Sequence, residues 1–468
     1  MRMPIPFAGA FDERTAKAVS SQTCINWYPD IVQTHGGQMM TLKMRPGLRL
    51  NQTLSIGPHR GAMIHNGVLY VVSNNSVFSV DQNDVATQIG SLNTYSGFVG
   101  MASSGSQMVI VDGIDGSYWN GTAFTQITDA DFVDAVQVKF QKGRFIVNKP
   151  GTGQFYISAD YDASSWAALD YATAEVDPDN LVALEIDHQE LWLFGNYTTE
   201  QYFYTGNTLF PFEPQPGAFS EFGCIAPWSV AKADNTLVWV SQTRNGGRQV
   251  VQATINNPIV ISSGSLEERM NLFTTISDAY SMVVKAPDKH LFLILTFPDA
   301  NETHVYDFST KLWHAWESYG VGRFRISTHV YAYGKHYMGD AINGNLYTFD
   351  ATSSQDNGVN IVRSRKTDHS TSNLDRLFCH SLELLFNVGQ GLITGQGLDP
   401  QVALYYSDDG GNNWGNAHTE SLGGIGEYGK RVKFDQLGAY RHRVWEVRIS
   451  DPVPTTLIGA FAEMSKEK

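Results

Sequence analysis

The sequence predicts an all-β fold in which a degenerate β-propeller is joined to a platform of β-sandwich or β-barrel type. Three observations support this prediction: a strand-and-turn unit recurs along the middle of the chain, 43 glycines supply tight turns, and aromatic residues reach 12%. Frequent turns between short strands rich in aromatic and β-branched residues are typical of all-β domains. The fold class therefore follows mainly from the repeat.

The repeat has seven units, which are spaced 36 to 50 residues apart. Their starts are Gly61, Gly100, Val136, Leu181, Ser229, Ala279 and Ile326. Each unit contains a strand, a polar turn, a strongly apolar strand such as 69–72, and a strand rich in Tyr and Phe. A period of about 40 to 50 residues is typical of the four-stranded blades of a propeller. Seven blades are favoured, and six is the alternative if one unit joins another sheet.

The flanking segments are expected to form the platform. Residues 1–55 contain CINWYPDI and MRPGL but no periodic core, so we interpret them as an N-terminal arm that is part of the platform. Residues 56–355 form the predicted propeller, and the polar stretch 351–358 marks its boundary. Strands resume in 356–468, which we expect to be a C-terminal β-sandwich or barrel domain. One short helix is expected at 264–273, where Ser265 can act as the cap.

The charge distribution argues against a protein that reads nucleic acid sequence. The formal net charge is −14, and residues 51–355 carry 15 Lys and Arg against 30 Asp and Glu. A module that holds phosphates needs a basic face. An acidic surface is compatible with DNA that slides past without binding, and equally with a charge that keeps a large protein soluble.

Cysteine usage and hydropathy indicate the compartment. Cys24, Cys224 and Cys379 are far apart and include no CxxC pair, so neither a disulfide framework nor a zinc site is predicted. Synthesis in a reducing cytoplasm is expected. No apolar run approaches the length of a membrane span, and the start lacks a hydrophobic signal segment, so no membrane insertion is expected.

One motif suggests hydrolytic chemistry. Ser407, Asp409, Gly411 and Trp414 satisfy the S-x-D-x-G-x-x-W pattern of an Asp box, which occurs in sialidase-like propellers. There the carboxylate caps backbone N–H groups and the Trp packs beneath the hairpin. A glycosidase also needs paired carboxylates, or a Tyr nucleophile with an arginine cluster, and no spacing singles out such a set. We therefore predict a structural turn, with no catalytic residue and no cofactor, and the chain is not expected to be an enzyme.

Neither histidine nor arginine patterns define a binding site unambiguously. The 13 histidines form no HExxH or HxH motif, so no metal site is predicted. Strand alternation places Arg441 and Arg443 on one face, and Arg448 follows. These arginines are candidates for a subunit interface or a contact with DNA phosphates. A solvated strand face is the other interpretation.

Several short motifs, taken in order, resemble a known family. They are NWYPD, RPGL, TTEQYFYTG at 198–206, VYD at 305–307, LYYSDDGGNNWG and RHRVWEVRIS. This order, together with the layout of seven units, resembles the packaged-DNA stabilisation proteins, or tail nozzle proteins, of short-tailed bacteriophages. The resemblance spans essentially the whole chain.

The resemblance implies a structural virion protein of the phage tail that is made in the host cytoplasm. It implies a homohexameric nozzle or tube below the portal and its adaptor, which closes the DNA exit channel, retains packaged DNA and conducts it during ejection. The implied partners are the portal-adaptor or head-completion protein, a tailspike or tail fibre, a tail needle or tip, and genomic DNA that passes through the lumen without sequence-specific binding. The alternative is a sialidase-like glycan-binding or glycan-cleaving propeller of a phage tail.

Overall fold

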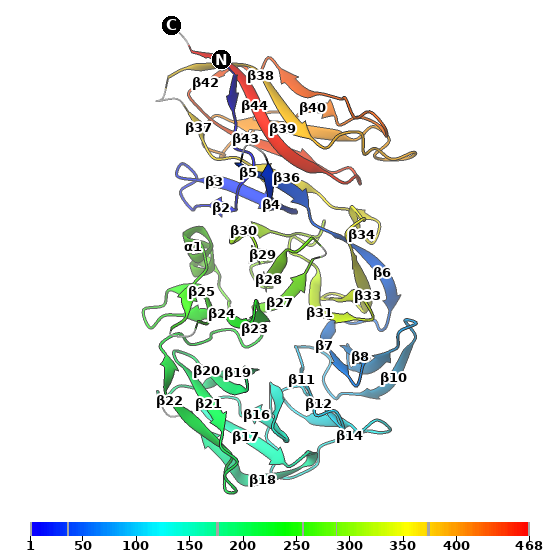
Figure 1. Cartoon of the computed structure of the whole chain (residues 1–468), viewed down its shortest axis with the longest axis vertical. Helices are drawn as coiled ribbons and strands as arrows, with labels where there is room; N and C mark the ends of the chain where they lie inside the picture. Colours follow the sequence, from blue (N-terminus) through cyan, green and yellow to red (C-terminus); the bar gives the residue numbers. More distant parts are fainter. Residues whose placement is uncertain are drawn as a thin grey trace.

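A computed structural model describes residues 2–34, 37–174, 177–254, 257–286, 288–371 and 375–466. Small sheets are arranged in a ring, and a second unit, the platform, continues from one side of the ring (Figure 1). The predicted β-propeller with a β-sandwich is therefore confirmed. The expected helix is α1 (Gly264–Leu272), but its cap is Ser263, which has the extended backbone of an N-cap and accepts the Leu266 N–H. Ser265 lies within the helix.

Five antiparallel sheets of four strands stand alone in the described residues. The first consists of β7 (His59–His65), β8 (Val68–Ser73), β9 (Ser76–Val80) and β10 (Ala86–Ser91). The second consists of β11 (Gly100–Ser103), β12 (Met108–Val111), β13 (Gly116–Trp119) and β14 (Phe124–Gln126). The third consists of β15 (Val138–Gln141), β16 (Arg144–Asn148), β17 (Gln154–Ala159) and β18 (Asp162–Thr173). The fourth consists of β19 (Leu181–Asp187), β20 (Glu190–Gly195), β21 (Thr199–Tyr204) and β22 (Phe212–Ser220). The fifth consists of β23 (Ala231–Ala233), β24 (Thr236–Gln242), β25 (Arg248–Gln252) and β26 (Ile259–Val260).

Two further sheets complete the ring and differ in how they end. One consists of β31 (Ile326–Ala332), β32 (Lys335–Asp340), β33 (Asn345–Asp350) and β6 (Gly47–Thr53), extended by β34 (Gln355–Asp356) and β35 (Val359–Asn360). The other consists of β27 (Tyr280–Lys285), β28 (Leu291–Phe297), β29 (Glu302–Asp307) and β30 (Leu312–Ala315). In the described residues, six sheets thus belong to the propeller alone, and the β27–β30 unit takes its place in the ring as part of an 11-stranded sheet shared with the platform. Six blades, with one unit joined to another sheet, is therefore the arrangement observed in place of the favoured seven.

The ring is closed by a strand from the N-terminal arm. β6 pairs antiparallel with β33 as the outer strand of the last blade and then leads directly into β7, the innermost strand of the first blade. The N-terminal segment 1–55 is therefore shared between the two units. Its strands through β5 (Gly37–Met44) belong to the platform, whereas β6 belongs to the propeller. Leu48 of β6 is buried between the last two blades, whereas Leu50 is 38% exposed.

Apolar side chains of the central strands fill the spaces between neighbouring blades. Val71 and Val109, for example, are fully buried and belong to strands whose residues are apolar on both faces. Such continuous apolar runs occur where a strand is buried on both sides. Each blade consequently depends on its two neighbours for its core.

The platform is a sandwich of two sheets built from both ends of the chain. One sheet contains β1 (Arg2–Pro4), β4 (Trp27–Thr34), β5, β38 (Leu377–Phe386), β41 (Val432–Asp435), β42 (Ala439–Tyr440) and β44 (Thr456–Lys466). The other contains β2 (Asp12–Glu13), β3 (Ser21–Ile25), β36 (Arg363–Lys366), β37 (Ser370–Thr371), β39 (Gln401–Ser407), β40 (His418–Ser421) and β43 (His442–Ile449). Trp27, Leu382 and Trp445 lie in the core between them. A bridge between β3 and β30 joins the second sheet to the propeller.

The closing strand should limit the stability of the propeller. Replacing Leu48→Ala removes a buried side chain and should lower the free energy of unfolding by about 2–5 kcal/mol. The control is Leu50→Ala, which changes an exposed residue of the same strand and should have little effect. Chemical denaturation measures both variants, and equal losses would contradict the role assigned to β6.

Candidate functional site: the propeller channel and the platform junction

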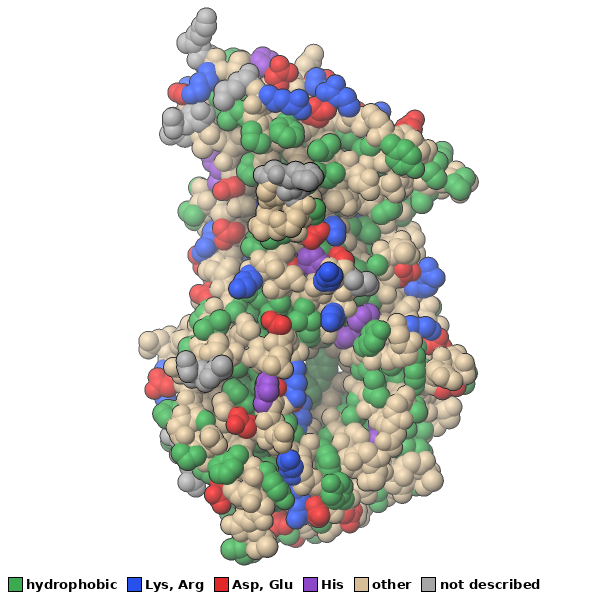
Figure 2. Space-filling model, in the orientation of Figure 1, with side chains coloured by type: hydrophobic (Ala, Val, Ile, Leu, Met, Phe, Trp, Pro, Cys, Tyr) green, Lys and Arg blue, Asp and Glu red, His purple; other side chains and the backbone are tan. Residues whose placement is uncertain are grey.

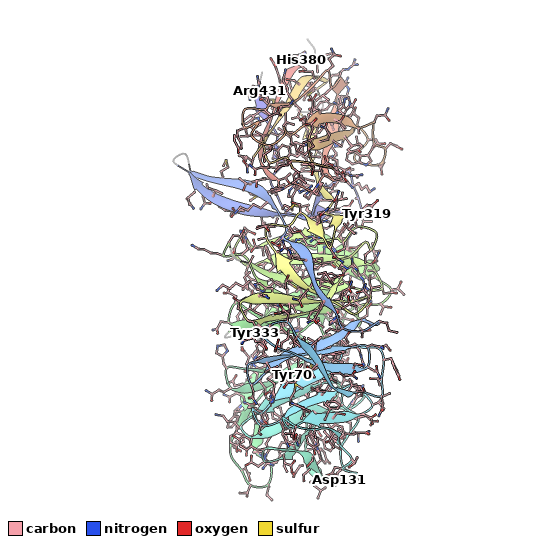
Figure 3. The ribbon with its side chains drawn as sticks, turned by 90° about the vertical axis from the view of Figure 1, so that its right-hand side faces the viewer. Tyr70, Asp131, Tyr319, Tyr333, His380 and Arg431 are labelled. Atoms are coloured by element: carbon pink, nitrogen blue, oxygen red, sulfur yellow. The ribbon has the colours of Figure 1, made fainter. Side chains whose placement is uncertain are left out.

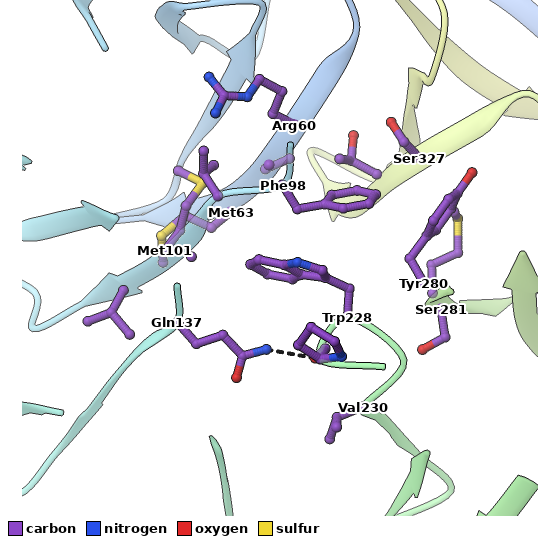
Figure 4. Close-up of a pocket in the computed structure, with 18 of the residues that line it drawn as sticks. Arg60, Met63, Phe98, Met101, Gln137, Trp228, Val230, Tyr280, Ser281 and Ser327 are labelled. Atoms are coloured by element: carbon purple, nitrogen blue, oxygen red, sulfur yellow. Dashed lines mark hydrogen bonds between the residues drawn. The ribbon is translucent and has the colours of Figure 1, made fainter. Parts of the chain in front are cut away.

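The channel through the propeller is a pocket lined by the innermost strands of the blades. Its volume is about 340 Å³, and its lining includes Phe98, Trp228 and Tyr280 (Figure 4). The ring centroids of Phe98 and Trp228 are 5.4 Å apart, and those of Phe98 and Tyr280 are 5.0 Å apart. Figure 2 shows the hollow on one face of the ring. The channel is therefore narrowed by a cluster of aromatic side chains.

Hydrogen bonds hold these aromatic groups in place. The Gln137 amide donates to the Pro227 carbonyl at 2.7 Å, next to Trp228, and accepts the Leu184 N–H at 2.8 Å. Arg60 is buried and donates to backbone carbonyls of the loop that precedes Phe98, including Gly97 at 2.6 Å and Ser96 at 2.8 Å. Its guanidinium is thus occupied by the fold and does not serve as a phosphate site.

The charged groups beside the channel neutralise one another. Lys139 contacts Glu185 at 2.5 Å, and Lys232 lies 3.7 Å from the same carboxylate. Burial acts to raise the pKa of Glu185, but the two ammonium groups hold it below its ordinary value. A pocket of this size and composition matches a small-molecule site in scale and is too small for duplex DNA, whose major groove alone is about 12 Å wide.

The junction between propeller and platform contains a buried ion pair, Arg45–Asp356. The two terminal nitrogens of the Arg45 guanidinium, Nη1 and Nη2, lie 3.0 and 2.6 Å from the two carboxylate oxygens of Asp356. The guanidinium also donates to Asn26 at 2.8 Å and to the Glu317 carbonyl at 2.8 Å, and Ser318 donates to Asp356. Arg45 lies at one chain crossing between the two domains and Asp356 at the other, where β34 pairs with β6. The pair therefore clamps both crossings together.

Sequence reasoning missed this clamp, although its parts were visible. Arg45 belongs to the MRPGL motif, and Asp356 lies in the polar stretch interpreted as a domain boundary. Nothing local indicates that the two residues meet. Two other arginines of the junction, Arg363 and Arg365, are also fully buried. Arg365 donates to the backbone carbonyls of Phe7 at 2.6 Å and Ala10 at 2.7 Å, so it attaches the N-terminal arm to β36.

A histidine joins the base of the β4–β5 hairpin to the blade β27–β30. His290 Nδ1 lies 2.7 Å from Asp307 and its Nε2 lies 3.2 Å from Asp30, so both ring nitrogens face carboxylates. Lys43 contacts Asp30 at 2.7 Å, and Asp288 lies nearby. Burial acts to lower the pKa of His290, but the hydrogen bond and charge of Asp307 raise it above its ordinary value. An imidazolium is favoured here because it can donate to both carboxylates.

The Asp box lies between β39 and β40 and has the geometry of a turn. The Asp409 carboxylate accepts the backbone N–H groups of Asn412 at 3.0 Å and Asn413 at 2.8 Å. Ser407 donates to Asp409 at 2.7 Å and accepts the Gly411 N–H at 2.8 Å. The Trp414 indole N–H donates to the Gly411 carbonyl. The N–H groups of Asn413 hold the pKa of Asp409 far below its usual range, so its carboxylate is engaged in the loop.

The three candidate arginines do not form one surface. Arg443 is buried, with both Asp408 oxygens at 2.5 and 2.7 Å, and its guanidinium lies 4.0 Å from the centre of the Tyr406 ring. The expectation that Arg443 contacts a partner or DNA is therefore wrong, because an ion pair and aromatic rings enclose it. Arg441 is exposed, and Arg448 is half-exposed beside Glu446 at 2.8 Å. These two residues remain candidates.

No cluster of three or more His, Cys, Asp or Glu side chains is arranged to hold a metal ion in the part of the chain that the structure describes. Within those same residues, no helix has the length and apolar character to cross a membrane.

Comparison with known families matches both domains. A family model described as the β-propeller of bacteriophage P22 Gp10 matches residues 1–354. A second model, described as the β-sandwich of the same protein, matches residues 363–465. The gap between the matches contains β34 and β35, where the chain leaves the propeller for the platform.

Solved structures share only a distant likeness. YCF48 bound to D1 peptide is 12% identical over 65% of this chain and 97% of its own, with a TM-score of 0.41. The N-terminal domain of Nup159 is 10% identical over 70% of this chain and 99% of its own, with a TM-score of 0.41. PorZ of Porphyromonas gingivalis is 13% identical over 64% of this chain and 39% of its own, with a TM-score of 0.39. A search of curated proteins gives no match. The assignment therefore rests on the family models.

Breaking the clamp should destabilise the whole chain. Asp356→Asn leaves the Arg45 charge buried without its partner, so the free energy of unfolding should fall by about 3–5 kcal/mol. The control is Asp375→Asn, which removes an exposed pair with Lys466 and should cost at most about 1 kcal/mol. Chemical denaturation measures both. A loss for Asp356→Asn no larger than the control would contradict the clamp.

Replacing His290→Gln should cost stability in a pH-dependent way. Because the folded state raises the pKa of His290, its contribution is complete below the unfolded pKa of about 6.5 and is lost as the pH rises through the folded pKa. The variant should therefore lose about 1.5–3 kcal/mol at pH 6 and less at pH 9. Thermal unfolding at both pH values measures this, with the exposed turn variant His188→Gln as control. A cost that grows with pH would refute the charged form.

Proposed function

Because the chain belongs to the bacteriophage P22 Gp10 family, we propose that it is the tail nozzle, a homohexameric ring below the portal and its adaptor that closes the DNA exit channel. At the level of the family, it is a structural component of the virion tail that stabilises packaged DNA. In the proposed role the ring retains the genome after packaging and conducts it during ejection. The match of both domains, in order along the chain, is the observation that carries this proposal.

The propeller channel supports a DNA path between copies rather than through one copy. Phe98 and Trp228 narrow a channel of about 340 Å³, and hydrogen bonds from Gln137 and Arg60 hold the surrounding backbone. Widening it enough for a duplex would require the blades to separate and expose their shared apolar cores. A lumen for DNA therefore requires several chains, as in a ring with repeated head-to-tail contacts.

The charge of the propeller suits a wall that does not hold DNA. Residues 51–355 carry a formal net charge of −15, from 15 basic and 30 acidic residues. Phosphate binding needs accessible Lys and Arg, but Arg60 of the channel lining is buried and bonded within the fold. Repulsion between an acidic wall and the phosphates would favour fast passage during ejection. Genomic DNA is thus a passing partner without sequence-specific binding.

The junction between platform and propeller favours a rigid connection of the two domains. The Arg45–Asp356 clamp and the 11-stranded sheet connect the platform to the propeller at separate places. In the proposed assembly, the platform contacts the portal-adaptor or head-completion protein, and a tailspike or fibre and a tail needle or tip bind nearby. Synthesis in the host cytoplasm agrees with three buried free cysteines, since a reducing compartment keeps thiols unpaired.

Phage that lack this protein should package DNA and then lose it, because the exit below the portal stays open. The measurement is the DNA content of purified heads, together with the nuclease sensitivity of the released DNA. Complementation with the wild-type chain is the control and should restore full heads.

A different outcome would point to the alternative function. Mutant particles that remain full and stable but fail to adsorb to the host would indicate a receptor-binding or glycan-degrading role. That result would overturn the proposed nozzle.

A further inference from the structure

The hairpin formed by β4 and β5 projects away from the body of the platform. Its strands pair with each other along their whole length, from Trp27–Met44 to Thr34–Gly37. Within the described residues, β5 pairs with β44 at its base alone, through Leu42 and Lys43. Figure 3 shows the outer part of the hairpin, in blue, extending beyond the rest of the molecule. An isolated two-stranded hairpin is marginally stable in water, so this arm is suited to packing against another surface.

Both faces of the projecting arm carry an apolar pair. Ile31 lies opposite Met40, and Val32 lies opposite Met39. Successive residues of a strand point to opposite faces, so one pair lies on each side of the ribbon. Ile31, Val32 and Met39 are each more than a third exposed. Burial of both faces between two apolar surfaces would be more favourable than their exposure to water.

The arm also lacks the features that keep exposed strands from associating. Residues 31–42 contain no Asp, Glu, Lys or Arg, and the pairing of the two strands is free of register shifts. Natural edge strands are usually protected by charges, proline or bulges, and a flat apolar edge without them tends to pair with another chain. The flanking charges, Asp30 and Lys43, pair with each other at the base. The arm is therefore expected to be buried against another protein surface.

A second uncharged surface lies at one end of the platform, in the loops 387–398 and 422–426, which we call the apolar tip. Its exposed apolar residues include Ile393, which is 77% exposed, and Ile425, which is 61% exposed. The two loops are bonded to each other, since the Gly426 N–H donates to the Gly389 carbonyl at 3.1 Å. Apolar side chains gather at the right-hand end of the platform in Figure 2, away from the hairpin that Figure 3 shows in profile.

We propose that the β4–β5 hairpin of one copy packs against the apolar tip of the next copy, head to tail around the ring. Each chain has a net charge of −14, so close contacts between copies are favoured where both surfaces are uncharged. The hairpin and the tip meet this condition and lie on different sides of the platform. A contact between two different surfaces can repeat from copy to copy and close into a ring. This inference rests on the proposed ring and names the surfaces that build it.

Cross-linking in assembled virions tests the contact. Phage are made with Val32→Cys and Ile393→Cys in the same chain, and purified particles are treated with a short bismaleimide. The native Cys24, Cys224 and Cys379 are buried, so the engineered thiols react selectively. Denaturing gels should show products at successive multiples of the chain mass for the double variant. Each single variant is a matched control and should give none.

Every other pattern would overturn the inference in a distinguishable way. If particles that hold several copies give no cross-linked products from the double variant, the proposed hairpin contact is refuted, but the proposed ring is not. Dimers from Val32→Cys alone mean that two hairpins meet, and a product of another mass means that another tail protein covers the arm. A single copy per particle removes both the ring and this inference.

A second measurement avoids dependence on virion assembly. The purified Ile31→Lys, Met39→Lys variant should unfold at the wild-type temperature, because both side chains are exposed. Mixed with adaptor protein, it should stay monomeric under conditions in which the wild-type chain forms the ring, as measured by mass in solution. A ring of normal mass from this variant would overturn the role of the hairpin.

Discussion

The Arg45–Asp356 ion pair is the interaction on which the architecture depends, because it lies where the chain passes twice between its two domains. After Arg45 the chain enters β6 and closes the propeller, and at Asp356 it returns to complete the platform. Both side chains are buried, so neither charge is stable without the other. Closure of the ring and attachment of the platform are thereby coupled. Such coupling fixes the platform and the propeller relative to each other, as suits a structural virion protein.

Local patterns predicted the fold well. The unit that starts at Gly61 places its apolar run 69–72 inside β8, the buried second strand of the first blade. The pattern is readable because a strand buried on both faces must be apolar throughout, whatever its distant neighbours are. The Asp-box side chains were equally readable, since Asp409 and the N–H groups it accepts lie within a few residues of each other. Propeller, sandwich and turn could thus be derived from short windows of sequence.

Long-range contacts could not be predicted in this way. Arg45 and Asp356 are separated by 311 residues, and β6 pairs with β33, which follows all the other blades in the sequence. Alternation placed Arg443 on a strand face but could not show that Asp408 and aromatic rings enclose that face. The same limit applied to the channel, where Phe98 and Trp228 come from different blades. The aromatic residues that narrow the channel were therefore visible only in three dimensions.

Density for the genome in an intact tail tests most directly whether DNA passes between copies of this chain. A reconstruction of the full virion should show the duplex on the axis of a sixfold ring, with Phe98 and Trp228 narrowing a DNA-free channel in every propeller. Density for DNA inside a single propeller, or a lone copy at the periphery of the tail, would contradict the proposed nozzle.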